Sequence, residues 1–381
     1  MNIRIYKGEA MIIGIPKEIM NHEHRVGLVP SDVALLQQSS TNHVIYVEDG
    51  LGSSIGYTNK DYERAGAKIV SNAKKIWEDS ELIVKCKEPI ESEFKYLRND
   101  MILYSFLDLA YSKELASALV ESRVTSICGE TIAGPKGNYP ILAAMSEVTG
   151  KFAAQHAATL LATNYGGRGV LIGGCAGVAP AKAVVIGGGA VGMNAARILV
   201  GMGADVSVLD IDTQKIANHP LTLENRIKVL YANEDSITQA LSGADILIGA
   251  VLVTATATPK VITREHLRLM NKGGVVLDVS VDLGGCIETS RQTTHDDPTY
   301  VEEGLIHYGV PNIPGVIART SSVTYSYESL PYVQCIANKS WREMLKMPGA
   351  IGGLNAYDGK IALESVAKSF SLPYIDTKSV L

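Results

Sequence analysis

The clearest chemistry in this sequence lies in a glycine-rich segment near its middle. Gly187, Gly189 and Gly192 form the pattern G-x-G-x-x-G between a strand-like apolar run and a helical pattern. In such a segment the first glycine permits a tight turn, the second lets the backbone approach a pyrophosphate, and the third allows close packing of helix on strand. The helix start, at Ala190 and Val191, offers unpaired N–H groups and a positive dipole end to the phosphates. The segment therefore predicts a dinucleotide-binding turn.

An acidic residue follows the next predicted strand, as this type of site requires. The strand spans Asp205–Leu209, and Asp210 comes directly after it, 23 residues beyond Gly187. A carboxylate at this place binds the ribose 2′-hydroxyl and repels a 2′-phosphate, and no Arg follows within the next few residues. NAD is therefore favoured over NADP. The alternative, a glycine-rich turn that binds nothing, explains less, because strand, helix, second strand and acidic residue occur in order.

Two other catalytic motifs are absent from the sequence, and one cluster of polar residues does not fit a metal site. A G-x-x-x-x-G-K-[ST] phosphate loop would need glycine where Met145 precedes Gly150 and Lys151, and no G-x-S-x-G occurs. The cluster His295–Asp297 precedes Pro298 and lies among Thr residues, which favours a turn over metal ligation. No metal site is predicted.

Charged residues follow two predicted strands in the first part of the chain. Arg25 has the planar donor fork that binds a carboxylate bidentately, although a surface Arg before a helix is an equal alternative. Lys85 and Lys87 lie two residues apart where the strand Leu82–Cys86 ends, which predicts that both amines share one face, and Pro89 would end this strand. Ligands of open α/β sheets gather at such strand ends, so these cations either line a cleft or mark an exposed strand end.

Three polar residues lie at the ends of predicted strands in the second part of the chain. Asp278 and Asp282 lie at the end of a strand that should be buried on both faces, where a carboxylate needs a partner or a function. Asn312 follows a later strand and either contacts a ligand or caps a turn. These residues are the next candidates for a site.

Alternating Val/Ile/Leu runs and amphipathic stretches must position these residues, and this pattern predicts parallel sheets with helices between the strands. The predicted strands are Met11–Ile15, Val44–Val47, Lys68–Val70, Leu82–Cys86, Met101–Phe106, Val124–Cys128, Ala183–Ile186, Asp205–Leu209, Ile246–Ala250, Val275–Val279 and Leu305–Gly309. The predicted helices include Pro30–Gln38, Lys113–Glu121, Met145–Thr163, Leu330–Lys346 and Ile361–Ser369. The fold class is α/β.

The order of these elements predicts two Rossmann-like domains with mainly parallel sheets around a central cleft, which would hold the ligand. A dinucleotide-binding domain, residues 146–314, is inserted into a discontinuous substrate domain, residues 11–145 and 315–381. The chain returns to the first domain at the Pro-punctuated Pro311–Gly315, and Gly166–Pro180 is either a hinge or a surface flap. Residues 1–10 receive no role.

Composition excludes several classes of protein. The 381 residues are 46% apolar and 20% charged, as in a globular protein with a sizeable core. A net charge of -5 with no block of Lys or Arg gives nucleic acid or an anionic membrane nothing to bind. No apolar run reaches the ~18 residues of a spanning helix, and the N-terminus lacks a signal-peptide core. Five scattered Cys favour a reducing compartment, so a cytoplasmic protein is expected.

Several blocks of the sequence together resemble one family, that of alanine dehydrogenase and the NAD-binding subunit of proton-translocating transhydrogenase. The blocks are GIPKEIMNHEHRVGLVP, KCKEPI, LLATNYGGRGVLIGGCAGVAPAKAVVIGGGAVGMNAA, IGAVLV, GGCIETSRQTTHDDPTY and the Asn-Ile-Pro-Gly crossing. The resemblance runs from about Met11 to near the C-terminus. It implies two Rossmann-like domains around a cleft, a homohexamer, and NAD-dependent interconversion of L-alanine with pyruvate and ammonia.

The resemblance also implies roles for single residues. Arg25 and Lys87 match positions that hold the substrate carboxylate and carbonyl, Asn312 is expected to contact the ligand, and Asp282 matches the catalytic aspartate. For NAD the matching residues are Ser146, Asp210, Lys215, Val251, Leu252, Val279, Asp282, Val310, Asn312 and Ile313, beside the glycine-rich turn. The reaction needs a neutral amine, a water and a base, and Asp282 supplies that base if burial raises its pKa.

One position departs from the family pattern. The family's catalytic His lies in a Phe-Leu-His-Leu-Ala segment, where this chain has FLDLA with Asp108 at its centre. A carboxylate is normally ionised near neutral pH and cannot then donate a hydrogen bond, whereas an imidazole can. Asp108 is predicted to be catalytic, and a proton shared with Asp282 would be one replacement for the imidazole. Smaller departures near the predicted cleft are Thr254–Pro259, Leu283, Pro311 and Ala176.

Three interpretations of the function remain open. The first is an NAD-dependent amino-acid dehydrogenase that acts on L-alanine and pyruvate. The second keeps this apparatus but changes the substrate to another amino acid, 2-oxo acid or imine, with Asp108 contacting a new amine or hydroxyl. The third is a non-catalytic NAD-binding oligomer, which rests on the lost His alone. Retention of Arg25, Lys87 and Asp282 favours the first.

Overall fold

A computed structural model describes residues 10–38, 42–135, 137–251 and 258–381 and divides the chain into two compact units. Unit 1 comprises the chain up to Met145 together with Gly315–Leu381, and unit 2 comprises Ser146–Pro314. Some residues that entered the predictions lie outside the described residues: Leu252, most of Thr254–Pro259 and the first nine residues. None of the helices in the described part of the chain is long and apolar enough to cross a membrane.

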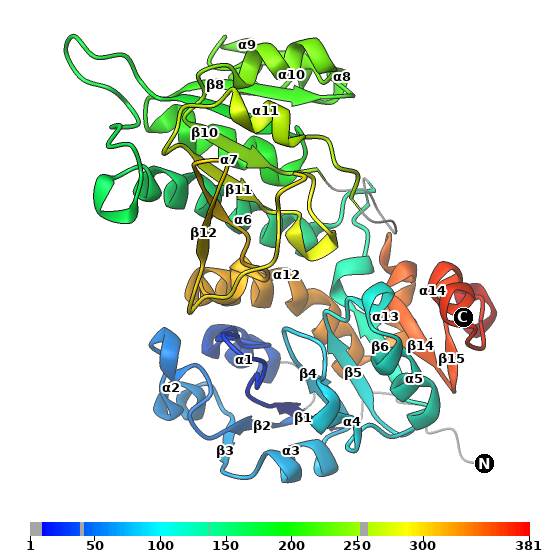
Figure 1. Ribbon diagram of the computed structural model, residues 1–381. Helices are drawn as coiled ribbons and strands as arrows, with labels where there is room; N and C mark the ends of the chain where they lie inside the picture. Colours follow the sequence, from blue (N-terminus) through cyan, green and yellow to red (C-terminus); the bar gives the residue numbers. More distant parts are fainter. Residues whose placement is uncertain (1–9, 39–41, 136, 252–257) are drawn as a thin grey trace. The chain divides into compact units, whose positions relative to one another are not determined.

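Unit 1 is built on an eight-stranded sheet in the order β15-β14-β6-β5-β4-β1-β2-β3 (Figure 1). Its strands are β1 (Ile12–Ile15), β2 (Val44–Glu48), β3 (Lys68–Val70), β4 (Leu82–Val84), β5 (Ile102–Ser105), β6 (Thr125–Cys128), β14 (Leu354–Tyr357) and β15 (Lys360–Ile361). The strands β1 to β6 are parallel, and β14 and β15 extend the sheet in antiparallel pairing. The strand order reverses between β1 and β4, and in such sheets ligands bind beyond the carboxyl ends of the strands at this switch point.

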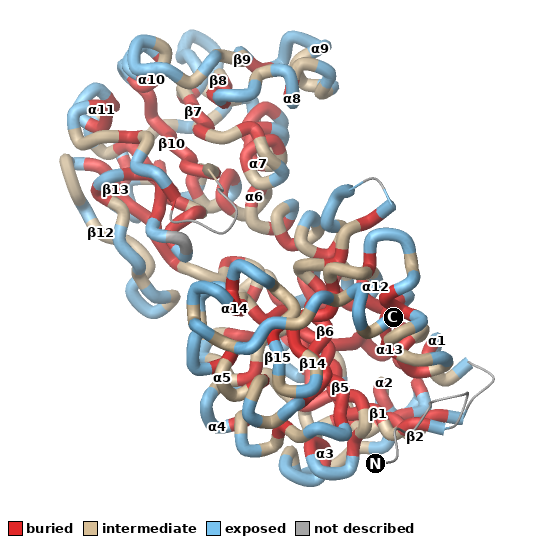
Figure 2. The backbone as a smooth tube through the Cα atoms, turned by 90° about the vertical axis from the view of Figure 1, so that its right-hand side faces the viewer, coloured by how far each residue is buried: buried red, intermediate tan, exposed pale blue. Residues whose placement is uncertain are grey.

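Both faces of the unit 1 sheet are buried, because successive strand residues join different apolar clusters. Leu82 and Val84 belong to one cluster, with α1, α12 and α13, and Ile83 belongs to another, with α3, α5 and α14. Figure 2 shows the neighbouring strands β5 and β6 as buried. The helices of unit 1 are α1 (Pro30–Gln37), α2 (Asn59–Arg64), α3 (Ala73–Asp79), α4 (Glu91–Phe94), α5 (Lys113–Ser122), α12 (Ala318–Asn338), α13 (Trp341–Leu345) and α14 (Glu364–Phe370).

A serine-lined face of α12 holds the segment after β1. The Ser322 hydroxyl accepts a hydrogen bond from the backbone N–H of Val26 at 3.1 Å, and the Ser326 hydroxyl accepts one from Val29 at 3.0 Å. Ser326 also donates to the Asp32 carboxylate. Because the hydroxyls have partners in this segment, a run rich in Ser and Thr is stable inside a helix.

Several predicted boundaries in the C-terminal part of unit 1 were therefore wrong. The helix predicted over Leu330–Lys346 begins at Ala318, contains Pro331 and ends at Asn338, and α13 forms a separate helix. The start of the helix predicted over Ile361–Ser369 belongs to β15, and α14 begins only at Glu364. Tertiary packing overrides the local preference of Ser, Thr and Pro for turns in α12.

Unit 2 contains a seven-stranded sheet in the order β12-β13-β11-β10-β7-β8-β9. Its strands are β7 (Lys182–Ile186), β8 (Asp205–Asp210), β9 (Lys228–Tyr231), β10 (Ile246–Gly249), β11 (Val275–Asp278), β12 (Thr299–Glu302) and β13 (Leu305–Tyr308). All pairs are parallel except that of β12 with β13. The strands β9 and β12 were not predicted, because they lie at the edges and their residues are largely half-buried or exposed.

Helices cover both faces of this sheet as well. They are α7 (Ala190–Gly201), α8 (Gln214–Ala217), α9 (Pro220–Leu223), α10 (Glu234–Leu241), α11 (Arg264–Arg268) and the C-terminal part of α6 (Pro140–Leu160). Val185 packs in the cluster of α6 and α7, whereas Val184 and Ile186 pack in that of α10 and α11. The helix predicted over Met145–Thr163 thus begins earlier and ends earlier. In the segment Gly166–Pro180, Leu171 and Val178 are exposed and a single β-bridge joins Cys175 to Val178.

Candidate functional site

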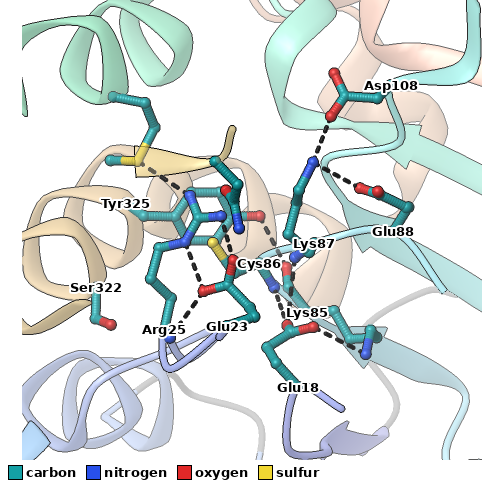
Figure 3. A network of polar contacts seen from close by, with 12 residues as sticks. Glu18, Glu23, Arg25, Lys85, Cys86, Lys87, Glu88, Asp108, Ser322 and Tyr325 are labelled. Atoms are coloured by element: carbon teal, nitrogen blue, oxygen red, sulfur yellow. Dashed lines mark hydrogen bonds and ion pairs between the residues drawn. The ribbon is translucent and has the colours of Figure 1, made fainter. Parts of the chain in front are cut away.

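A buried charge network joins the carboxyl ends of β1 and β4 (Figure 3). Glu18, which follows β1, accepts hydrogen bonds from the backbone N–H groups of Cys86 at 2.7 Å and Lys87 at 3.3 Å. The Lys85 amine lies 3.0 Å from both Glu18 and Glu93. Burial alone would lower the pKa of Lys85, but the two carboxylates raise it above its ordinary value, so the amine stays charged. Lys85 is therefore a structural cation, which stabilises unit 1 by joining Glu18, after β1, to Glu93 in α4.

The prediction that Lys85 and Lys87 share one face was wrong. The strand ends at Val84, so the alternation of strand side chains does not continue through these residues. Figure 3 shows the two amines directed at different partners, Lys85 at Glu18 and Lys87 at Asp108. Of the two, Lys87 is the candidate for binding a substrate.

Arg25 belongs to the same region and is buried, so it is not the surface Arg of the alternative interpretation. Its Nε donates to Oε1 of Glu23 at 2.8 Å and its Nη2 donates to Oε2 at 2.5 Å. Its Nη1 lies 3.5 Å from the Met145 sulfur. Burial would lower the pKa of Arg25, yet its anionic neighbours, Glu23 among them, raise it. A substrate carboxylate must therefore share this fork with Glu23 or displace it.

Lys87 lies between two carboxylates. Its Nζ forms ion pairs with Asp108 and, at 3.0 Å, with Glu88. The Lys87 side chain is only 12% exposed, whereas that of Asp108 is 48% exposed. Burial would lower the pKa of Lys87, but Asp108 and Glu88 raise it. Lys87 is thus a fixed cation at the position where the resemblance expects contact with the substrate.

Asp108 has an unusual backbone conformation. Its φ is +44°, in the left-handed region that Asp tolerates better than most residues, and its N–H donates to Oε1 of Glu130 at 2.9 Å. Glu130 lies in the turn Gly129–Thr131 after β6. Burial and the charge of Asp108 raise the pKa of Glu130 to about 8, against a lowering effect of Lys87. Sequence reasoning missed Glu130, as well as Glu18, Glu23, Glu88 and Glu93.

An open cavity of about 890 Å³ adjoins this cluster within unit 1. Glu88 and Asp108 lie on its wall, and α4 and α5 supply most of the remainder. The two carboxylates that hold Lys87 therefore also border solvent-accessible space.

The glycine-rich turn of unit 2 has the shape that a dinucleotide pyrophosphate needs. Gly187 has a φ of +99°, which favours glycine. A Cβ on Gly192 would lie 1.8 Å from the carbonyl oxygen of Gly187, so helix α7 packs against the turn at a distance that only glycine allows. A Cβ on Gly189 would meet nothing within 4 Å, which leaves space above the backbone. The helix begins at Ala190, and Val191 follows in its first turn.

Asp210 ends β8 beside this turn. Its Oδ2 accepts a hydrogen bond from the Gly188 N–H at 2.6 Å and lies 3.3 Å from the Lys215 amine, and its Oδ1 accepts one from the Asp212 N–H at 2.8 Å. Burial would raise the pKa of Asp210, but these contacts lower it below its ordinary value. Asp210 and Lys215, predicted separately, therefore form one ion pair at the end of β8, the strand end at which sheets of this kind bind a ribose.

The two aspartates after β11 have different environments. Asp278 is buried and accepts hydrogen bonds from the Ile287 N–H at 3.1 Å and the Ser290 hydroxyl at 2.6 Å, so it stabilises the loop after the strand. Asp282 is exposed, and the expectation of a buried Asp282 was wrong because β11 ends at Asp278. Asp282 and Asp108 belong to different units, so a proton shared between them stays a prediction.

The structure brings Asp282 together with another predicted residue of unit 2. The Asn312 N–H lies 3.5 Å from Oδ2 of Asp282, and Asn312 has a φ of +52°. Val251 and Val279 lie beyond neighbouring strands β10 and β11, where the Ser280 hydroxyl donates to the Val251 carbonyl at 2.6 Å. Of the remaining predicted residues, Val310 and Ile313 are buried near the end of β13 and Ser146 is half-buried on α6.

Comparison with family models matches both parts of the chain. Residues 14–149 match the model of the alanine dehydrogenase/PNT N-terminal domain, and residues 153–364 match that of the alanine dehydrogenase/PNT C-terminal domain. Together the two matches account for most of the chain.

Individual proteins are similar over their full length. An alanine dehydrogenase of Methanococcus maripaludis is 41% identical over 97% of this chain and 100% of its own, and one of Mycolicibacterium smegmatis is 41% identical with the same coverage. A solved L-alanine dehydrogenase structure has a TM-score of 0.90 at 38% identity, covering 95% of this chain and 99% of its own. A transhydrogenase of Sinorhizobium meliloti shares the fold, with a TM-score of 0.78 at 22% identity over 93% of this chain and 99% of its own.

Proposed function

The chain belongs to the alanine dehydrogenase/PNT family, and on this premise we propose that it catalyses the NAD-dependent oxidative deamination of L-alanine to pyruvate and ammonia, and the reverse reductive amination. It is an NAD-dependent amino-acid dehydrogenase. The observation that carries this conclusion is identity of about 41% over the full length of curated alanine dehydrogenases, joined to a match in structure over both units.

Two cations of unit 1 bind the substrate in this proposal. Lys87 contacts the substrate carbonyl or carboxylate, since its amine is charged and held in place by Asp108 and Glu88. Arg25 holds the carboxylate with its planar fork, whose other donors remain on Glu23. Both groups would act as fixed charges that orient a small anion.

The residues of unit 2 fit NAD. The open space above Gly189 and the start of α7 at Ala190 suit a pyrophosphate, and the ionised Asp210 suits a ribose hydroxyl and repels a 2′-phosphate. When bound, NAD supplies the hydride acceptor, and NADH supplies the donor. Asp282 exchanges the proton of the substrate amine or of the attacking water. By the family resemblance we also infer a homohexamer in the cytoplasm.

The chemistry at Asp108 separates this proposal from its alternatives. An ionised Asp108 cannot donate to a carbonyl as the family's His can, but the Lys87 amine that it binds is a hydrogen-bond donor. In this proposal Lys87, oriented by Asp108, donates to the carbonyl oxygen.

The test is NADH consumption with pyruvate and ammonium over a range of pH, beside a panel of other 2-oxo acids and imines and the reverse reaction with L-alanine. Turnover of pyruvate well above that of the other acids is the expected result. Turnover of another acid instead would show that the substrate has changed. If NADH binds and nothing is turned over, even by Asp108→His, the non-catalytic interpretation replaces the proposal.

A further inference from the structure

A carboxyl group that the proposed mechanism does not use lies directly beside the backbone of Asp108. Oε1 of Glu130 accepts the Asp108 N–H at 2.9 Å. That N–H belongs to a residue with a φ of +44°, a conformation that costs free energy in residues with a Cβ, although Asp tolerates it better than most. The hydrogen bond therefore stabilises the backbone geometry from which the Asp108 carboxylate reaches Lys87.

Glu130 is also the third carboxyl group near one cation. Lys87 already binds Asp108 and Glu88. An anionic Glu130 would leave three carboxylates around one amine, whereas a neutral Glu130 leaves two. Burial and the charge of Asp108 both disfavour the anion, and together they raise the pKa of Glu130 to about 8.

The other titratable groups that face Glu130 and have a shifted pKa do not change their protonation state near neutral pH. Burial raises the pKa of the Cys128 thiol and of the Tyr111 hydroxyl, so both remain neutral. The pKa of Lys87 is raised by its carboxylate partners, so the amine remains a cation. Among Glu130, Cys128, Tyr111 and Lys87, the group whose pKa lies nearest neutrality is therefore Glu130, at about 8.

We propose that Glu130 is a positioning residue for the substrate: its Oε1 holds the backbone of Asp108, whose carboxylate pairs with Lys87, and when Glu130 is ionised it adds a negative charge that weakens binding of an anionic 2-oxo acid. This inference rests on the proposed function, since it assumes that the anionic 2-oxo acid binds at Lys87 and Arg25. The proton passes between Glu130 and solvent, and no covalent step is involved. The consequence is a site whose affinity for the oxo acid falls as pH rises.

The experiment measures pyruvate binding without turnover, by calorimetric titration into the protein loaded with NAD⁺. Glu130→Gln retains an oxygen that accepts the Asp108 N–H but cannot ionise. Between about pH 6 and about pH 9 we expect the Kd of the wild type for pyruvate to rise about tenfold, as one added charge a few ångströms away predicts, and that of Glu130→Gln to stay level. Glu121→Gln, at an exposed position of α5, should follow the wild type.

Glu130→Ala tests positioning separately from charge. It removes the acceptor of the Asp108 N–H as well as the ionisable group. The KM for pyruvate of Glu130→Ala should be raised at every pH, with a smaller change in kcat, and Glu130→Gln should restore most of the loss. A merely structural role would instead lower the yield or stability of both variants without this difference in KM.

A stability measurement checks the titration without any substrate. Because the pKa of Glu130 in the folded protein lies above its ordinary value of 4.5, the folded state holds the proton more tightly, and this contribution to stability is lost as pH rises from about 5 to about 8. The Tm of the wild type should therefore fall relative to that of Glu130→Gln over this range.

The outcomes are distinguishable. A wild type that turns over no pyruvate contradicts the proposed function, whatever Glu130 does. A wild type that turns over pyruvate, but whose Kd changes with pH as that of Glu130→Gln does, overturns the inference on Glu130. So does a difference in Tm that is constant with pH.

Discussion

Strand β1 of unit 1 and strand β7 of unit 2 have the same place in their sheets, each beside the strand at which the order reverses. The segments after these two strands differ in chemistry. The segment after β1 supplies charged side chains: Glu18 contacts Cys86 beyond β4, and Arg25 pairs with Glu23. The segment after β7 brings glycines, and its polar groups are backbone N–H groups.

This difference shows two ways of building a site on one topology. Side-chain charges can be directed at a small anion, but when buried they need partners of their own, as Lys85 has in Glu18 and Glu93. Backbone N–H groups at a helix start bear only partial charges and need no counterion, but they require a backbone that the ligand can approach. Unit 1 is therefore suited to a small charged substrate, and unit 2 to an extended phosphate ester.

The largest effect that tests this comparison is expected from Gly192→Val. The new Cβ would lie 1.8 Å from the Gly187 carbonyl oxygen, so α7 must move. We expect a loss of about 3 kcal/mol or more in the stability of unit 2 and at least about 100-fold weaker NADH binding, measured by thermal unfolding and by fluorescence titration. The control Gly201→Ala lies in the same helix, where a Cβ meets nothing, and should retain NADH binding. Normal NADH binding by Gly192→Val would disprove the packing argument.

Lys87→Met should lower the turnover of substrate, assigned to unit 1, without weakening the binding of NADH, assigned to unit 2. Removal of the amine leaves Asp108 and Glu88 without their shared cation and the substrate without its donor. We expect kcat/KM for pyruvate to fall about 100- to 1000-fold, which corresponds to about 3–4 kcal/mol, while NADH binding is retained. Steady-state kinetics and NADH titration measure the two quantities. The exposed Lys113→Met is the control, and an equal loss there would contradict a specific role for Lys87.

Asp210→Ser should change the choice of cofactor. It removes the charge that repels a 2′-phosphate and releases the Lys215 amine, now 3.3 Å from the carboxylate. We expect the ratio of NADPH to NADH use to rise about 10- to 100-fold. In the wild type, burial opposes ionisation of Asp210 but its hydrogen bonds and Lys215 lower its pKa, so preference for NADH should persist to about pH 5. If the wild type loses its preference for NADH while the pH is still above this value, the assignment of Asp210 to the cofactor ribose is contradicted.

The smallest effect is expected from Ser326→Ala on α12. The substitution removes a hydroxyl that accepts the Val29 N–H and donates to Asp32. Both are buried, so we expect a loss of about 1–2 kcal/mol and a fall of a few degrees in Tm. Val323→Ala, on the exposed side of the same helix, should leave the Tm unchanged within about 1 °C. Equal shifts in both variants would show that the hydroxyl contributes nothing specific.

Sequence patterns predicted the parts of the fold that follow a strict period. Strands such as β4 and β10 are continuous apolar runs because both of their faces are buried, and runs of this kind are visible without a structure. The edge strands β9 and β12 lack that signal, since one side of each faces solvent. The N-terminal part of α12 was hidden by its serines, whose partners come from a distant segment.

The candidate site divides in the same way. The glycine-rich turn was found because a backbone requirement leaves a fixed spacing in the sequence. Arg25 and Lys87 were candidates because they are charged residues that follow predicted strands, but their specific roles, and the choice of Asp108, came from resemblance to a family. Glu130 was not found, because its importance comes from contact with Asp108 and Lys87, residues brought together by three different strands. The spacing of residues within a short segment of sequence cannot indicate contacts between residues that follow different strands.

The serine-lined face of α12 has a consequence for synthesis on the ribosome. Ser322 and Ser326 bond to backbone groups that lie 296 and 297 residues earlier in the chain. Translation proceeds from the N-terminus, so the segment bearing Arg25 emerges long before the helix that holds it. All of unit 2 is synthesised between the two parts of unit 1, so unit 2 can fold before unit 1 is complete. The segment that bears Arg25 thus acquires its final support only when the nascent chain is nearly complete.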